Sequence, residues 1–312
     1  MSSSPSNKTD RILITGANGH LGRQLIAHLS SQQRVRALVR SSRAAAVLAA
    51  LPERILPETR IVDYRDTSAL EAAARGCRTV VHLVGIIKES RGASYREAHE
   101  ESCQVLAAAA AAAGVQRIVY LSIAGANPDS SNACLASKGR AEEILLGGSV
   151  PAVILRVPMV LGPDDFASRA LRAQARAKVT ALIRGGASLQ QPIDAADVCA
   201  AILAAAQQPG LDDTRLDLGG PECLSHRSLV ERAAALYGGH PFVIPVPLRA
   251  MRILTSIVEK ISANPPITRA MLEVLEQDDQ LDSEGAAKRL GIELTPLDHT
   301  LERYLGEEVP AR

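Results

Sequence analysis

Aromatic residues are scarce in this chain of 312 residues, which has no tryptophan, two phenylalanines and five tyrosines. Proteins that bind single-stranded nucleic acid stack bases on aromatic side chains, so such a surface is not expected here. An excess of one charge is also lacking, because 35 basic residues stand against 34 acidic ones. No field of the whole molecule attracts nucleic acid or anionic lipid, and we predict no nucleic-acid partner.

Long apolar runs and paired cysteines are missing too. No window approaches the run of about 18 apolar residues that spans a membrane, and the polar residues 1–10 lack the apolar core of a signal peptide. These absences predict a cytoplasmic protein. The five cysteines lack CxxC spacing, which argues against a zinc site and a disulfide framework. We therefore predict no metal site.

In the first half of the chain, short β-branched runs alternate with alanine-rich helical stretches. The pattern predicts a helix over residues 20–31 and strands over residues 11–15, 35–39, 60–62, 79–83, 117–121 and 152–155. Such alternation favours right-handed βαβ units, and hence a parallel sheet with helices on both faces. The predicted fold class is α/β, a doubly wound Rossmann sheet with a small, mostly helical C-terminal cap.

The second half has a looser rhythm and frequent prolines. It predicts helices over residues 167–178, 195–207, 225–237, 248–261 and 268–277. Asp194 is expected to cap the second of these helices, with Asp197 as its partner in a capping box. We interpret residues 1–10 as a flexible tail, 11–160 as the NAD(P)-binding domain, and 161–312 as the remaining Rossmann elements and the substrate cap.

A glycine-rich loop lies between the first predicted strand and the first helix, in residues 15–22, with the spacing GxxGxxG. Gly16 is expected to permit the sharp turn, Gly19 the approach of backbone to a pyrophosphate, and Gly22 the tight packing of helix on strand. This context predicts a bound dinucleotide. The other loop positions assigned to the cofactor are Thr15, Asn18, His20 and Leu21.

Arginines follow the second predicted strand, at the position where folds selective for NAD usually carry an acid. An acid there repels a 2′-phosphate, whereas a guanidinium binds it through two hydrogen bonds. Arg40, together with Arg43, therefore favours NADP(H) over NAD(H). The alternative is that both arginines simply form a solvated strand end.

Two further segments are expected to contact the cofactor. Asp63 and Tyr64 follow the third strand, where a carboxylate and its neighbouring backbone can meet the adenine. Residues Leu83, Val84 and Gly85 close the fourth strand, and the glycine lets backbone approach the ribose.

These motifs resemble extended and atypical short-chain dehydrogenase/reductases, and in particular the subgroup of the NADPH-binding accessory subunit of mitochondrial complex I. The resemblance extends over IVYLSIAGA at 118–126, SK at 137–138, LRVP at 155–158 and LGGP at 218–221. The most discriminating motifs are PPIT at 265–268, LEQD at 275–278, TPL at 295–297 and RYL at 303–305, which resemble that subgroup more than sugar epimerases.

In active members of the resembled family, a tyrosine four residues before a lysine moves the proton that accompanies hydride transfer, helped by a serine. Lys138 is present here, but Cys134 stands at the tyrosine position. The serine position falls at Ala124, or is displaced to Ser122, and His99 replaces a helix asparagine. The resemblance thus gives Lys138, Cys134 and Ser122 as candidate catalytic residues.

The geometry expected of these candidates weakens the case for chemistry. A thiol is several ångströms shorter than a phenol, so Cys134 is either a proton donor or a small filler residue. Lys138 is expected to contact the ribose and nicotinamide, the alternative being a surface lysine. Val157 and Pro158 are expected to shape the wall of the nicotinamide pocket. Whether the chain is an enzyme stays open at this point.

Three functions fit these residues. The leading hypothesis is a protein that holds NADPH with weak or no dehydrogenase activity of the ordinary kind, linked to a respiratory complex or to quinone metabolism. The second is an active NADP-dependent oxidoreductase or epimerase with a small hydrophobic or quinone-like substrate. The third is a redox sensor that binds NADP without turning it over.

Residues 248–261 have apolar side chains at helical spacing and basic residues at 249, 252 and 260. Such a stripe either packs on the core of the cap or lies on a membrane surface or a partner. Core packing is the commoner explanation. The resemblance favours a peripheral location at the inner face of a membrane, beside a membrane-associated respiratory partner.

Overall fold

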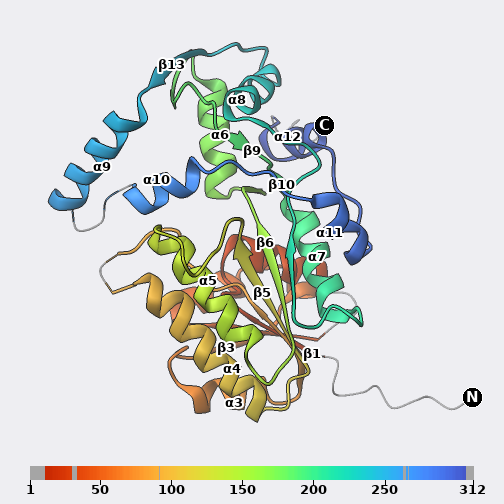
Figure 1. The fold of residues 1–312 in the computed structure, drawn as a ribbon. Coiled ribbons are helices and arrows are strands. Elements are labelled where there is room, and N and C mark those ends of the chain that lie inside the picture. Colours follow the sequence, from red (N-terminus) through yellow and green to blue (C-terminus); the bar gives the residue numbers. More distant parts are fainter. Residues whose placement is uncertain (1–10, 30–33, 91, 263–264, 266, 307–312) are drawn as a thin grey trace, which may run out of the picture.

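A seven-stranded parallel sheet forms the centre of the computed structural model, which describes residues 11–29, 34–90, 92–262, 265 and 267–306 (Figure 1). The strand order is β11-β6-β5-β4-β1-β2-β3. The predicted tail of residues 1–10 lies outside the described residues. The strands are β1 (Arg11–Thr15), β2 (Val35–Val39), β3 (Glu58–Ile61), β4 (Cys77–His82), β5 (Arg117–Ile123), β6 (Ala152–Val157) and β11 (Thr214–Asp217).

Helices cover both faces of this sheet, which confirms the predicted doubly wound α/β class. Successive side chains on a strand point to opposite faces, so Val119 of β5 joins one apolar cluster while Ile118 and Tyr120 join the other. The first cluster includes residues of α1 (His20–Leu29), α2 (Ser42–Ala49), α7 (Ala195–Gln207) and α11 (Ser283–Leu290). The second includes residues of α3 (Thr67–Ala74), α4 (Ser102–Ala112) and α5 (Ala133–Leu146).

Two short helical turns complete this half of the chain. The 3-10 turn η1 (Glu53–Ile55) precedes β3, and the π-helical turn η2 (Arg96–Glu101) leads directly into α4. Strands β1 and β2 have the predicted bounds, whereas β3 and β4 begin two residues earlier than predicted and β5 and β6 end two residues later. The predicted end of the first helix, at residues 30–31, lies outside the described residues.

The C-terminal region has its own apolar cluster, formed mainly by α6 (Phe166–Arg176), α8 (His226–Ala235) and α12 (Leu297–Leu305). Helix α10 (Arg269–Leu275) packs on α5, between the sheet and this region, and α9 (Leu248–Ile261) lies on the outer side of α10 (Figure 1). Of the five helices predicted here, α7 and α9 have the predicted bounds. Three strand pairs were not predicted: β7 (Val160–Leu161) with β10 (Ile193–Asp194), β9 (Leu189–Gln190) with β12 (Leu224–Ser225), and β8 (Val179–Ile183) with β13 (Phe242–Val246).

Asp194 caps α7 as predicted, because its carboxylate accepts a hydrogen bond of 2.8 Å from the backbone N–H of Ala196. The capping-box role of Asp197 is wrong. Its carboxylate instead accepts hydrogen bonds of 2.7 and 2.8 Å from the backbone N–H and hydroxyl of Thr295. An aspartate is shorter than the usual glutamate partner, and here it binds the segment before α12 instead of returning to the cap.

Candidate functional site

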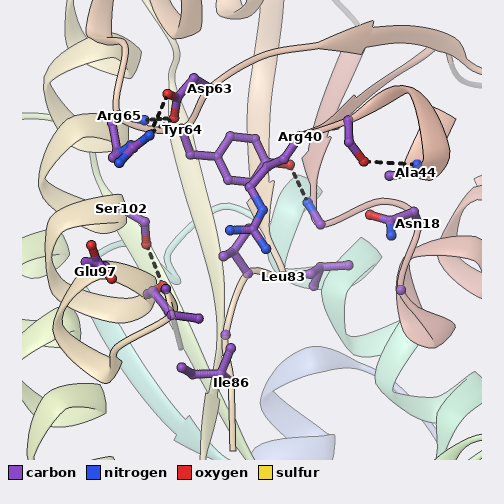
Figure 2. A pocket seen from close by; sticks show the side chains of 18 residues that line it. Asn18, Arg40, Ala44, Asp63, Tyr64, Arg65, Leu83, Ile86, Glu97 and Ser102 are labelled. Carbon is purple, nitrogen blue, oxygen red and sulfur yellow. Dashed lines mark hydrogen bonds and ion pairs between the residues drawn. The ribbon is translucent and has the colours of Figure 1, made fainter. Parts of the chain in front are cut away.

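A cavity of about 710 Å³ lies at the carboxyl ends of β1, β2, β3 and β4 (Figure 2). Parallel strands end at one edge of their sheet, so loops far apart in sequence meet there. Nine of the predicted cofactor residues line this cavity: Gly16, Asn18, Gly19, Arg40, Asp63, Tyr64, Leu83, Val84 and Gly85. Thr15, His20, Leu21, Gly22, Arg43 and Lys138 are not among the residues that line it.

The geometry of the glycine loop explains two of its glycines. Gly16 has a φ of 68°, and a Cβ there would lie 3.1 Å from the backbone carbon of Leu83. A Cβ on Gly22 would lie 2.6 Å from the carbonyl oxygen of Ala17. The first glycine therefore permits a left-handed turn beside β4, and the second permits close packing of α1 on the loop.

The side chain of Tyr64 is hydrogen-bonded to the glycine loop. Its hydroxyl donates a hydrogen bond of 2.7 Å to the carbonyl of Leu38 and accepts one of 3.0 Å from the backbone N–H of Gly16 (Figure 2). Burial raises the pKa of this phenol to about 12, so it stays protonated. Tyr64 thus links the loop to the end of β2, a contact that spacing in the sequence could not show.

Two arginines, Arg40 and Arg65, line this cavity. The exposed guanidinium of Arg40 extends into the space between Tyr64 and Leu83 (Figure 2). Asp63 at the cavity wall is paired with Arg65, whose hydrogen bonds hold the pKa of that carboxyl below its usual value. The cavity therefore favours an anionic group near Arg40.

A buried histidine, which the sequence analysis did not single out, joins β1 to β4 behind this cavity. His82 Nδ1 and the hydroxyl of Thr15 are hydrogen-bonded at 2.7 Å, and Nε2 lies 3.4 Å from the hydroxyl of Ser102 on α4. Complete burial lowers the pKa of His82 to about 3, so the ring is neutral at pH 7. Thr15 thus helps to hold the ends of β1 and β4 together and does not line the cavity.

Lys138 of α5 is buried, which excludes the alternative of a surface lysine. Its Nζ donates hydrogen bonds of 2.9 Å to the hydroxyl of Tyr120 and to the carbonyl of Leu121. Burial lowers its pKa to about 8. A Cβ on Gly85 would lie 3.2 Å from Nζ, so the lysine sits directly behind a glycine of the cavity wall.

Cys134 lies under the loop that follows Gly85. Its side chain is only 1% exposed, and its Sγ lies 3.9 Å from the carbonyl oxygen of Ile86. Burial raises the pKa of this thiol, which keeps it protonated. The backbone N–H of Ile86 also donates a hydrogen bond of 3.1 Å to Nε2 of His99, whose pKa burial lowers to about 3. His99 and Cys134 therefore both contact this loop segment.

A second cavity, of about 580 Å³, adjoins the first across the same loop, since Ile86 lines one and Ile87 lines the other. Its lining is mainly apolar and comes from the end of β6 and from helices α6, α8 and α10. Val157 and Pro158 line this cavity, together with Ala124 at the family's serine position. The sequence predicted helices in these three segments but not that they meet at one cavity, because such a meeting depends on contacts between distant segments.

A comparison with known protein families indicates the class of ligand that the first cavity binds. Residues 16–209 match the family model described as NAD(P)H-binding. This chain belongs to the NAD(P)H-binding family. That membership and the seven-stranded sheet confirm the predicted dinucleotide-binding Rossmann class.

Several curated proteins are similar to this NAD(P)H-binding chain over most of its length. NADH dehydrogenase (ubiquinone) 1 alpha subcomplex subunit 9, mitochondrial, of Arabidopsis thaliana is 28% identical, covering 93% of this chain and 75% of the relative. The 4-hydroxy-2-methyl-3-oxo-4-farnesyl-3,4-dihydroquinoline-1-oxide ketoreductase of Stigmatella aurantiaca is also 28% identical, covering 90% and 91%. The solved structure of MoeE5 in complex with UDP-glucuronic acid and NAD has a TM-score of 0.72 at 22% identity, covering 95% and 97%, and shows the shared fold.

In this NAD(P)H-binding chain, Ser122 points away from both cavities. Its hydroxyl donates a hydrogen bond of 2.6 Å to Glu142, a fully buried carboxylate on α5. The same carboxylate accepts three further hydrogen bonds from Arg156, the shortest of 2.6 Å, and is paired with Arg215 at 3.1 Å. Ser122 is thus part of a buried ionic cluster between α5, β6 and β11.

Within the residues that the structure describes, no group of three or more His, Cys, Asp or Glu side chains is placed to hold a metal ion. A search of the same residues finds no helix with the length and apolar character needed to cross a membrane.

Proposed function

We propose that this chain holds NADPH, in preference to NADH, with weak or no dehydrogenase activity of the ordinary kind. The observation that carries the proposal is the combination of a complete dinucleotide cavity with a buried Cys134 in place of the proton-donating tyrosine. Bound NADPH supplies a hydride. The residues around it bind and orient the cofactor, but none of the expected proton donors lines either cavity.

The cavity fits NADPH in its shape and its charge. Gly16 and Gly19 line the cavity and carry no side chain, so backbone N–H groups at the start of α1 can approach phosphates. Arg40 extends into the cavity, where a guanidinium can pair with a 2′-phosphate. Lys138 lies behind Gly85, close enough for its ammonium to stabilise the negative charge of the cofactor.

We further propose that the protein works in or near a respiratory complex or in quinone metabolism, at the inner face of a membrane. The similarity to a mitochondrial NADH dehydrogenase subunit over 93% of this chain supports this setting. A membrane-associated respiratory subunit is the partner that we expect.

A second candidate is an NADPH-dependent reductase with a small hydrophobic or quinone-like substrate. The apolar cavity beside the cofactor cavity favours it, because a space of about 580 Å³ is large enough for such a molecule. The ketoreductase of Stigmatella aurantiaca is a relative of this kind. In this case water would supply the proton, since the Cys134 thiol is covered by the loop at Ile86.

The nucleotide retained by the purified protein distinguishes these functions. We expect absorbance and mass spectrometry to detect NADPH after extensive desalting, and NADPH oxidation with quinone analogues to be slow. Cys134→Ala should leave that slow rate unchanged, as should Cys199→Ala, a matched control at a buried thiol of α7. Rapid release of the nucleotide with fast turnover would instead support the reductase, and loss of turnover in Cys134→Ala alone would show that the thiol relays the proton.

A further inference from the structure

Helix α9 turns four of its apolar side chains away from the protein. Ile253, Leu254, Ile257 and Ile261 are between 49% and 81% exposed. At 3.6 residues per turn, these four positions lie on one side of the helix. The structure thus overturns the core-packing explanation of this stripe.

The opposite side of α9, which carries the half-buried Met251 and Val258 as well as polar residues, packs against α10. Thr255 is fully buried on this side, and Arg252 is 4.0 Å from Glu273 of α10. The carboxylate of Glu259 accepts a hydrogen bond of 2.8 Å from the backbone N–H of Arg269, where α10 begins. A helix that only covers a core leaves no such apolar stripe on its outer side. The outward stripe therefore needs an occupant from outside the described residues.

Charge on α9 indicates what that occupant is. Arg249 and Lys260 are exposed and lie along one edge of the apolar stripe, while the single acidic residue of the helix, Glu259, is engaged by α10. An apolar stripe edged by basic residues is typical of helices that lie in the headgroup region of anionic membranes. A second copy of this chain would present the same two cations against its own stripe, which is electrostatically unfavourable.

We propose that α9 docks on an anionic membrane surface, with its axis in the plane of the headgroups. Helix α10, against which α9 packs, contributes Met271, Val274 and Leu275 to the apolar cavity. Docking would therefore place the wall of this cavity beside lipid, from which an apolar molecule can enter it. The entry of an apolar molecule from lipid rests on the proposed function, whereas the docking of α9 itself does not depend on the cofactor.

The test is flotation of the full chain, loaded with NADPH, with vesicles of phosphatidylcholine alone or mixed with phosphatidylglycerol. We expect binding to the mixed vesicles only, weakened by salt. Arg249→Gln with Lys260→Gln should weaken it about 30-fold, and Ile253→Ser with Ile257→Ser at least about 100-fold. The matched controls are Lys288→Gln with Arg289→Gln, an equal change of charge on α11, and Leu56→Ser, at another exposed apolar side chain.

Absence of binding to the mixed vesicles, equal binding to both kinds, or an equal effect of the controls would overturn the proposal. A dimer would also overturn it, if light scattering shows that the dimer forms with rising concentration, that Ile257→Ser abolishes it and that the wild type does not bind vesicles. A second copy of the chain would then cover α9. NADPH affinity, measured on every variant, shows whether the variant is folded. If the wild-type protein binds vesicles but does not retain NADPH, the proposed cofactor role is wrong and the proposed docking of α9 stands.

Discussion

The ammonium of Lys138 is hydrogen-bonded to the hydroxyl of Tyr120, 2.9 Å away on β5, and its Nζ lies 4.4 Å from the centre of the same ring. A buried cation is costly unless polar groups compensate it. Tyr120 and the carbonyl of Leu121 provide this compensation from the sheet. The lysine can therefore remain buried at the back of this cavity, behind Gly85.

Arg40 should determine the preference between the two nucleotides. We expect Arg40→Ala to weaken NADPH binding about 10-fold while NADH binding changes little, because only NADPH carries the 2′-phosphate. Fluorescence titration with both nucleotides measures the ratio. Arg43→Ala is the control, since Arg43 does not line the cavity. Equal losses of affinity for the two nucleotides would show that Arg40 does not bind the 2′-phosphate.

Gly22 should be intolerant of any side chain. A Cβ would lie 2.6 Å from the carbonyl oxygen of Ala17, so Gly22→Ala must move the backbone of the loop or of α1. We expect the free energy of unfolding to fall by about 1–3 kcal/mol, as for overpacked cores, and NADPH affinity to fall with it. Gly239→Ala, where the nearest atom would be 3.6 Å away, should be tolerated in the same urea titration. Similar losses in both variants would refute the close-packing role.

Glu142 should be among the carboxylates most important for stability. It is fully buried and paired with Arg156, so Glu142→Ala leaves a partly buried guanidinium with only the more distant Asp217, 3.9 Å away. We expect a loss of about 3 kcal/mol in the free energy of unfolding, measured with urea at pH 7. Its exposed neighbour provides the comparison, with Glu143→Ala expected to change stability by no more than about 0.5 kcal/mol. A small effect in Glu142→Ala would mean that water compensates Arg156.

Acid should destabilise the protein through its buried histidines. The pKa values of His82 and His99 are lowered to about 3 in the fold, whereas an unfolded histidine titrates near about 6.5. Between these values the unfolded chain binds more protons, so stability falls as pH decreases through this window. Each histidine should cost about 2 kcal/mol between pH 7 and pH 5.

His99→Asn tests this acid sensitivity, because it removes one of the two titrating rings. Urea unfolding at pH 7 and pH 5 should show that the variant loses about 2 kcal/mol less than the wild type over this interval. The comparison is made within each protein, so a uniform loss of stability in the variant does not affect it. His28→Asn, at an exposed position, should keep the wild-type difference. An unchanged difference in His99→Asn would show that His99 is not a neutral buried ring.

Local signals were sufficient for much of the fold. The bounds of β1, β2, α7 and α9 follow from runs of apolar residues and from caps, which act within one element. The pair of β8 with β13 could not be predicted in this way, because it joins two segments about sixty residues apart and β13 carries no buried residue that would give it a periodic pattern. The same reason hid His82, whose partner Thr15 lies 67 positions earlier in the chain.

The sequence by itself predicted that a dinucleotide is bound, because the loop spacing is a local fact, and its family resemblance implied that Cys134 stands at the position of a proton-donating tyrosine. Only the tertiary structure decided what the remaining groups do. It turned Ser122 toward Glu142, buried Cys134 under Ile86 and placed Lys138 behind Gly85. It also faced the apolar side of α9 outward. Periodicity tells which residues share a face, but what that face contacts depends on packing between elements distant in the chain.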